Sequence, residues 1–272
     1  MSRPIHRVFF AVFFVLSFGR SIAARAETQY VQEPQLGACG QWNDVVQHLQ
    51  QGRLDGRAAR ERFKSLWRTV TVDDLPSPKE NHWQWMFPLP GYDAACFGES
   101  YDVEDYRFLD GPGAKGYPGL RLYIRDPRRI GVEERTQKEQ AVVSASDGVV
   151  VAAEKFWKPA DPNPWGDYAF VLDQQDKLLF LYGDLGRLRV SPGQLILKGE
   201  VLGWLGRTGR GVQDQRLGTQ LRFEVHTFDD GLFYPVYPGR ALRVAGHTEW
   251  PIPAGVVRPH FKAPKLPPAP LF

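Results

Sequence analysis

The sequence predicts a mainly β protein, in which an antiparallel β domain is preceded by a small α-helical hairpin. Two observations predict this class. Before about residue 70, apolar residues recur at steps of three and four, whereas from residue 117 onward runs of Val, Leu, Ile, Phe and Tyr alternate with turn residues. The chain has 272 residues, of which 43% are hydrophobic and 24% charged, so a sizeable core is expected.

The helical hairpin is expected within residues 27–75, where QWNDVVQHLQQGRL and GRAARERFKSLWRTV are separated by Gly52 and by Asp55-Gly56. The β domain is expected over residues 76–250. In it, QAVVSAS and VVVAAE flank an Asp-Gly pair, which predicts a hairpin, and DYAFVLD and DKLLFLYG predict a second one. Prolines crowd residues 251–272 and predict an extended C-terminal tail.

Residues 1–26 have the layout of a secretory signal peptide. MSRPIHR is positively charged, VFFAVFFVLSFG is apolar, and Ala24 and Ala26 supply small residues for cleavage. The apolar run is shorter than the ~20 residues that span a bilayer, although an uncleaved anchor is the alternative. We therefore predict cleavage near Ala26, a periplasmic or secreted location, and no membrane span in the mature chain.

Charge and cysteine content narrow the interpretation further. The net charge of +3 is small and its basic residues are scattered, which argues against a nucleic-acid partner. The only two cysteines are Cys39 and Cys96. In an oxidising compartment such a pair predicts one disulfide, and two free buried thiols are the alternative.

The stretch GTQLRFEVH, residues 218–226, predicts a strand that presents polar side chains on one face. Successive side chains of a strand point to opposite sides. Leu221, Phe223 and Val225 therefore face a core, and the opposite face carries Gln220, Arg222, Glu224 and His226.

Residues from about 116 to 228 resemble the M23 family of LytM or lysostaphin-type zinc peptidases. Five motifs occur in the family's order: YPGLRLYI, ASDGVVVAAE, LLFLYGDL, VSPGQLILKGEVLGWLGRTG and GTQLRFEV. The resemblance implies a LytM-type β domain, similar to a duplicated hybrid motif. It also implies peptidoglycan chemistry that depends on zinc.

This chain departs from the family pattern at the positions that bind zinc and at those that assist catalysis. The resemblance assigns the zinc ligands to Tyr117, Arg121 and Arg222, and the two catalytic histidine positions to Asp184 and Gln220. Zinc needs imidazole, thiolate or carboxylate donors, and a guanidinium has no lone pair to offer. We therefore expect neither zinc nor another cofactor. A new metal site of Asp184, Glu224 and His226 is the alternative.

The residues that stand at these positions are predicted to contact one another. We expect Arg121 and Arg222 to fill the former metal cavity and Asp184 to pair with one or both, because a charge-assisted contact offsets the cost of burying such groups. Solvated side chains on a cleft floor are the alternative. A binding groove would combine these three residues and Gln220 with aromatic residues of the loop KFWKPADPNPWGDY, although the aromatics also fit a role in capping the core: Trp157, Trp165 and Tyr168.

These features predict a secreted or periplasmic, catalytically inactive M23/LytM-like domain. Its expected partners are peptidoglycan, a cell-wall hydrolase that it activates or scaffolds, or another envelope protein. One alternative is an active peptidoglycan metalloendopeptidase with non-standard ligands. Another is a carrier domain of the biotinyl or lipoyl kind, for which Lys155 and Lys177 lie in unsuitable contexts.

Overall fold

The structure is a computed structural model that describes residues 28–70, 84–98, 100–213 and 217–245. The predicted signal peptide, the predicted tail and the three predicted domain boundaries lie outside these ranges. Within them, no helix has the length and apolar character needed to cross a bilayer.

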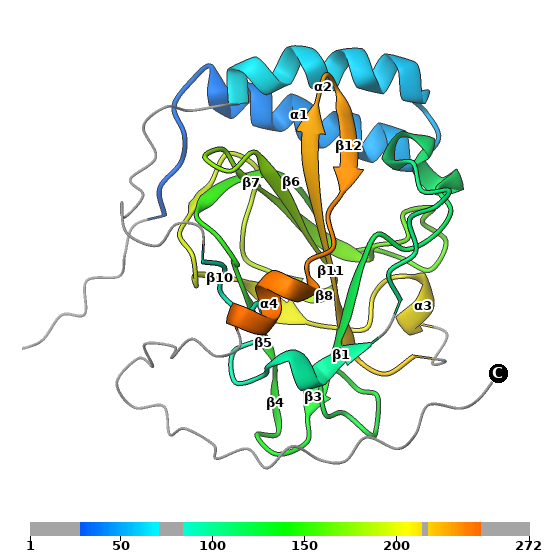
Figure 1. The fold of residues 1–272 in the computed structure, drawn as a ribbon, viewed down its shortest axis with the longest axis vertical. Helices are drawn as coiled ribbons and strands as arrows, with labels where there is room; N and C mark the ends of the chain where they lie inside the picture. Colours follow the sequence, from blue (N-terminus) through cyan, green and yellow to red (C-terminus); the bar gives the residue numbers. More distant parts are fainter. Residues whose placement is uncertain (1–27, 71–83, 99, 214–216, 246–272) are drawn as a thin grey trace, which may run out of the picture.

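The predicted helical hairpin is present at the N-terminal side of the fold (Figure 1). It consists of α1 (Gln35–Gln50) and α2 (Gly56–Val70). The chain turns between them through Gly52, whose φ of 67° lies in the left-handed region that glycine tolerates. Asp55 then caps α2, since its Oδ1 accepts a hydrogen bond from the Ala58 backbone N–H at 3.0 Å. Helix α1 begins earlier than the apolar pattern predicts.

The rest of the chain is mainly antiparallel β-sheet, which confirms the predicted fold class. The described strands pair in the order β1-β2-β11-β8-β7-β6-β9. In addition, β10 pairs with both β5 and β8, and β12 pairs with β11. The strands are β1 (Phe97–Gly98), β2 (Gly119–Tyr123), β5 (Ala141–Val143), β6 (Gly148–Glu154), β7 (Asp167–Asp173), β8 (Leu178–Leu188), β9 (Leu195–Ile196), β10 (Val201–Leu205), β11 (Gln220–Asp229) and β12 (Leu232–Pro235).

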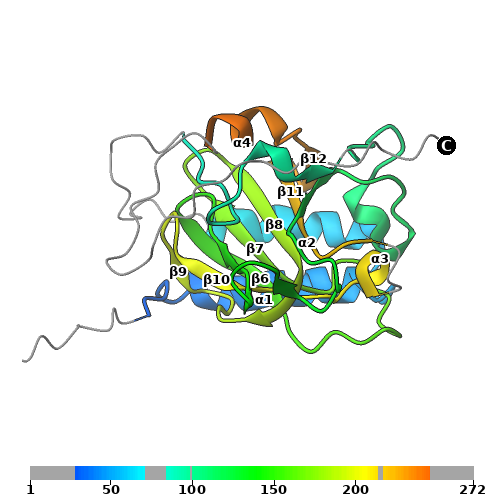
Figure 2. The ribbon, with the colours of Figure 1, turned by 90° about the horizontal axis from the view of Figure 1, so that it is seen from below.

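Smaller elements complete the described fold. A separate ribbon pairs β3 (Val132–Glu133) with β4 (Lys138–Glu139). The short helices are η1 (Ala94–Cys96), η2 (Phe108–Gly113), α3 (Arg210–Gln213) and α4 (Gly239–Ala245). Leu242 and Ala245 of α4 belong to the hydrophobic cluster on the face of the sheet opposite the helical hairpin. Figure 2, viewed from below, shows α4 at the upper edge of the fold and the helical hairpin behind the sheet.

One predicted hairpin is confirmed and the other is wrong. Strands β7 and β8 pair as expected, with Asp173 opposite Leu178. In contrast, β5 and β6 flank the Asp-Gly pair without pairing with each other, because β5 pairs with β10 and β6 pairs with β7 and β9. A Cβ on Gly148 would lie 2.5 Å from the Leu172 carbonyl oxygen. Glycine is therefore required there for close strand packing rather than for a two-residue turn.

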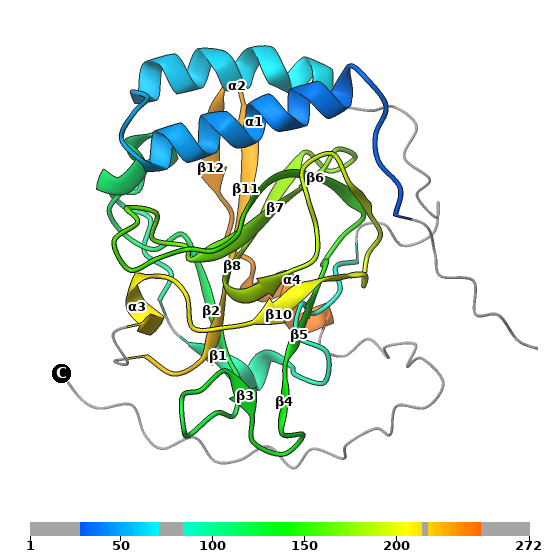
Figure 3. The same cartoon turned by 180° about the vertical axis from the view of Figure 1, so that it is seen from behind.

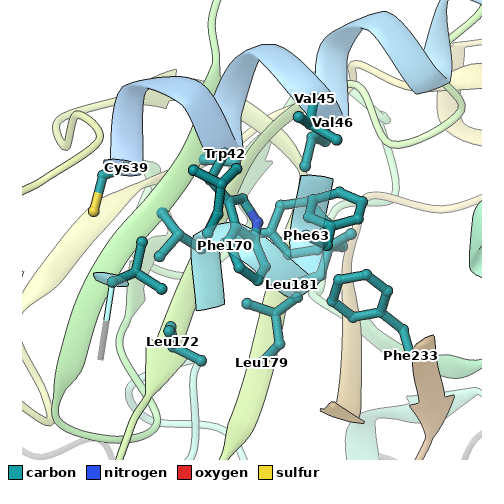
Figure 4. Close-up of a cluster of buried hydrophobic side chains, with 14 of the residues drawn as sticks. Cys39, Trp42, Val45, Val46, Phe63, Phe170, Leu172, Leu179, Leu181 and Phe233 are labelled. Carbon is teal, nitrogen blue, oxygen red and sulfur yellow. The ribbon is translucent and has the colours of Figure 1, made fainter. Parts of the chain in front are cut away.

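Hydrophobic side chains fill both faces of the sheet. On one face the helical hairpin packs against β6, β7 and β8, as Figure 3 shows from behind. Figure 4 shows Trp42 and Phe63 of the helices meeting Phe170 and Leu181 of the sheet. The other face forms a second cluster. Alternate residues of β7 and β8 contribute to it, as do residues of β10 and β11: Val171, Phe180, Tyr182, Leu202 and Phe223.

The predicted disulfide is not formed. Cys39 lies in the core beneath the helical hairpin, whereas Cys96 packs against the core on the opposite face of the sheet, and both are free thiols. Burial raises the pKa of the Cys39 thiol to about 11. The alternative of two free thiols therefore describes the structure.

Candidate functional site

The residues at the family's zinc and histidine positions come together in a polar cluster around three adjacent strands: Arg121 lies on β2, Gln220 and Arg222 on β11 and Asp184 on β8, while Tyr117 lies just before β2. Arg222 on β11 lies opposite Arg121 on β2 and opposite Gly183 on β8. The even-numbered side chains of β11 share the predicted face, since Leu221, Phe223 and Val225 enter the opposite core. The strand register thus brings Arg121 and Arg222 together from segments that lie far apart in the sequence.

Two guanidinium groups lie over one tyrosine ring at the centre of this cluster. The Cζ atoms of Arg121 and Arg222 are 4.2 and 4.5 Å from the ring centroid of Tyr117. The negative π face of the ring attracts cations at this range. Burial raises the pKa of the Tyr117 hydroxyl far above its usual value, so the ring stays neutral at physiological pH.

Arg222 pairs with Glu224 rather than with Asp184. Its Nε donates to Glu224 Oε1 at 2.5 Å, and the two side chains are 12% and 0% exposed. Such a pair is expensive to bury, and removing either partner leaves a charge without compensation. The sequence-based hypothesis of an arginine–aspartate contact is therefore wrong in its partner, although Arg222 does occupy the expected position.

Asp184 has an amide as its partner. Its buried Oδ2 accepts a hydrogen bond from Gln220 Nε2 at 3.0 Å. Burial raises the pKa of this carboxyl to about 7, a shift that the Gln220 hydrogen bond and the positive charges of Arg222 and Arg121 limit. Asp184 thus titrates close to neutral pH, and the arginines act on it through space without touching it.

His226 is enclosed by aromatic rings next to Glu224. Its ring lies 5.9 Å from that of Tyr106 and 5.7 Å from that of Phe108, and its Nε2 is 3.8 Å from Glu224 Oε2. Neither ring nitrogen has a hydrogen-bond partner within the described structure. Burial, and then the charge of Arg222, lower the pKa of His226 to about 3, so the imidazole is neutral at pH 7.

The inner part of the cluster is closed to solvent, whereas Tyr117, Arg121 and Arg222 are partly exposed. Asp184 is 3% exposed, and Gln220, Glu224 and His226 are likewise buried. Tyr106 and Phe108 form part of this cover, and sequence reasoning did not assign either residue to the site. The sequence feature that could have identified them is the spacing of aromatic residues in YDVEDYRFLD, directly before the family-like motifs. Solvated side chains on a cleft floor are therefore absent at these buried positions.

The predicted aromatic groove residues belong to the interior. Trp157, Trp165 and Tyr168 are 9%, 3% and 0% exposed, and Trp165 and Tyr168 join the core beneath the helical hairpin. The indole Nε1 of Trp157 donates to the Asn163 carbonyl at 2.9 Å. Their role as groove contacts is therefore wrong, and the alternative of core packing holds.

The donor set does not fit a zinc ion. Two of the three family ligand positions hold guanidinium groups, which have no lone pair and repel a dication, and the third holds a neutral phenol. Among the residues that the structure describes, no three His, Cys, Asp or Glu side chains gather as a metal site. Glu224 and His226 are neighbours, but Asp184 is bound to Gln220 and does not complete the alternative set.

The comparisons with known proteins agree with the resemblance. Residues 128–233 match the model of Peptidase family M23. The match contains Asp184, Gln220 and Arg222 and begins after Tyr117 and Arg121. A search of curated proteins found no match.

Several solved structures are similar at low identity. A putative peptidase M23 from Pseudomonas aeruginosa is 16% identical, with 70% of this chain and 63% of that chain covered and a TM-score of 0.39. A putative glycyl-glycine endopeptidase lytM from Ruminococcus gnavus is 18% identical, with 80% and 88% covered and a TM-score of 0.38. The lysostaphin catalytic domain from Staphylococcus simulans is 18% identical, with 54% and 91% covered and a TM-score of 0.35. This chain spans less than two thirds of the Pseudomonas structure.

Proposed function

Since residues 128–233 carry the sequence pattern of peptidase family M23, we propose that this chain is a non-catalytic member that acts in the cell envelope by binding. Its partner is peptidoglycan, or a cell-wall hydrolase or envelope protein that it activates or scaffolds. The proposed location is periplasmic or secreted.

The proposed loss of catalysis rests on one observation. Arg121 and Arg222 contact the ring of Tyr117, and Arg222 also pairs with Glu224. Metal-assisted hydrolysis needs a cation that polarises the substrate carbonyl and acidifies a water molecule. Here fixed positive side chains occupy the ligand positions. Asp184 and Gln220, at the two catalytic positions, are also 3% and 2% exposed, which keeps their side chains from contact with a substrate peptide.

Catalysis is tested by measuring zinc in the purified protein and turbidity loss on isolated murein, with an active M23 peptidase as the positive control. We expect substoichiometric zinc and no turbidity loss. Stoichiometric zinc together with lysis would establish the alternative, an active metalloendopeptidase with non-standard ligands, and would overturn the proposal.

Binding is tested separately. Co-sedimentation with murein and co-purification from crosslinked cells identify the partner class, and a phosphoryl or nucleic-acid resin serves as the control for non-specific charge. We expect retention on murein or recovery of an envelope protein. Failure of both would reject the binding role even where the lysis assay is negative.

A further inference from the structure

We propose that a pocket beside β2 binds the C-terminal carboxylate of a short peptide. The pocket has a volume of about 670 Å³ and lies between β2, the segment around Tyr101 and Tyr237, which follows β12. Cavities of this size are typical of sites for small ligands. It adjoins the buried part of the cluster, because Tyr117 and Arg121 belong to the cluster and also line the pocket, and it opens to the surface, where Tyr237 is 47% exposed.

Three of the residues that line this pocket each carry a donor atom with no hydrogen-bond partner among the described residues. Ser100 Oγ, Tyr117 Oη and Arg121 Nε are buried atoms without a hydrogen-bond partner. Each carries a hydrogen to donate, and buried donors are almost always satisfied in folded proteins. A carboxylate supplies two oxygens that accept several hydrogen bonds at once, and charge strengthens each bond. The donor set therefore favours a carboxylate.

Arg121 has no ion-pair partner among the described residues, although its charge acts through space on Asp184. Glu224 neutralises Arg222, whereas no described carboxylate lies within ion-pair distance of Arg121. The Tyr117 ring, 4.2 Å from Arg121 Cζ, holds the guanidinium in place without neutralising it. Asp102 lines the pocket too, but it is exposed, so solvent and salt screen its repulsion of an anion.

The remaining walls fit an apolar side chain. The Tyr101 and Tyr237 rings contact each other edge to face with centroids 5.1 Å apart. Such rings bind apolar and aromatic groups well. A terminal residue with an aromatic side chain presents both groups together, its carboxylate toward Arg121 and its ring toward the two tyrosines. A bare inorganic anion would leave these walls unused.

The proposal is separable from the proposed function, because binding of a chain end here requires neither murein nor the absence of hydrolysis. The probe is N-acetyl-Ala-Ala-Phe with a free carboxylate, titrated by calorimetry against its C-terminal amide. We expect saturable binding of the acid and at least tenfold weaker binding of the amide. N-acetyl-Ala-Glu-Phe amide, whose carboxylate lies on a side chain, should bind as weakly as the first amide.

Matched variants locate the site. Arg121→Gln should weaken the acid at least tenfold and abolish its advantage over the amide. Arg187→Gln is the control, since Arg187 also stacks on an aromatic ring, 3.9 Å from Trp204, and should leave both affinities unchanged. Should Arg121→Gln fail to fold by circular dichroism, Tyr101→Ala replaces it and should weaken acid and amide by a similar factor.

Four results would each overturn the proposal. They are absence of saturable binding of the acid, equal affinity for acid and amide, equal binding of the side-chain carboxylate peptide, and competition by inorganic phosphate at the same concentration as the peptide. An equal loss of affinity in Arg187→Gln would also place the site elsewhere.

Discussion

One face of β11 passes through two environments within a single strand. Toward its start, Gln220, Glu224 and His226 lie in a buried polar cluster in which each retains an atom without a partner. Toward its end, Phe228 enters the aromatic layer under the helical hairpin. It stacks on Trp67 at 4.2 Å and contacts Phe233 at 5.2 Å.

The two ends of β11 differ in whether burial of their side chains stabilises the fold. The aromatic end consists of side chains whose burial and ring contacts are favourable on their own. The polar end carries groups that are costly to bury and are only partly compensated. Natural proteins tolerate such departures mainly where function requires them, which makes the polar end the informative one.

The largest effect is expected at the aromatic end. Trp42 is fully buried and contacts the rings of Phe63 and Phe233 at 4.9 and 6.1 Å. Trp42→Ala should lower the free energy of unfolding by about 3–5 kcal/mol, measured by urea denaturation. Phe156→Ala, at an 86% exposed side chain, is the control and should change it by less than about 0.5 kcal/mol. A loss under about 1 kcal/mol for Trp42→Ala would mean that the hairpin contributes little.

The buried ion pair should give the next effect. Glu224→Leu leaves the Arg222 charge buried without a counterion, and we expect a loss of about 3 kcal/mol in unfolding free energy. Adding Arg222→Met should restore most of that loss, because two apolar side chains replace the pair. Denaturant titration of both variants checks this. Additive losses in the double variant would contradict the pairing.

Asp184 should make stability depend on pH. Its folded-state pKa of about 7 lies above the ordinary 3.8, so the folded protein binds this proton more tightly than the unfolded chain does. The resulting stabilisation is complete below about pH 4 and is lost as the pH rises through 7, with a slope of up to about 1.4 kcal/mol per pH unit. Asp184→Asn, which can still accept from Gln220, should remove this slope. Parallel pH profiles for the two proteins would refute it.

The smallest effect at pH 7 is expected at His226. His226→Phe removes two buried nitrogens without partners and keeps a ring beside Tyr106 and Phe108, so stability at pH 7 should rise by about 1 kcal/mol. The folded pKa of about 3 lies below the ordinary 6.5. Wild-type stability therefore falls as the pH drops from 6.5 toward 3, and the variant should lack that fall. A loss of stability at pH 7 would indicate that the imidazole has a polar partner.

Local patterns were sufficient for much of the fold. Apolar spacing predicted both helices, and alternation along β11 predicted which side chains share its polar face, because these periodicities follow from backbone geometry. The Asp147-Gly148 pair led to the wrong prediction of a hairpin turn. Gly148 instead allows close packing against Leu172 on another strand.

The candidate site was predicted only in part. The motifs placed Tyr117, Arg121 and Arg222 together, and strand register confirms that arrangement. The partner of Arg222 was missed, because two carboxylates were available and sequence spacing does not rank them. The cover by Tyr106 and Phe108 was missed as well, since it depends on how the segment before β2 folds back.

The sequence by itself determined the fold class, the polar face of β11 and the presence of arginine where zinc ligands would stand, because each of these is a property of residue type and short-range spacing. Only the tertiary structure decided that Glu224 neutralises Arg222, that Asp184, Gln220 and His226 are buried and that Arg121 lines an open pocket. Those outcomes depend on distances between segments far apart in the chain, and charge and burial act through such distances rather than through sequence neighbours.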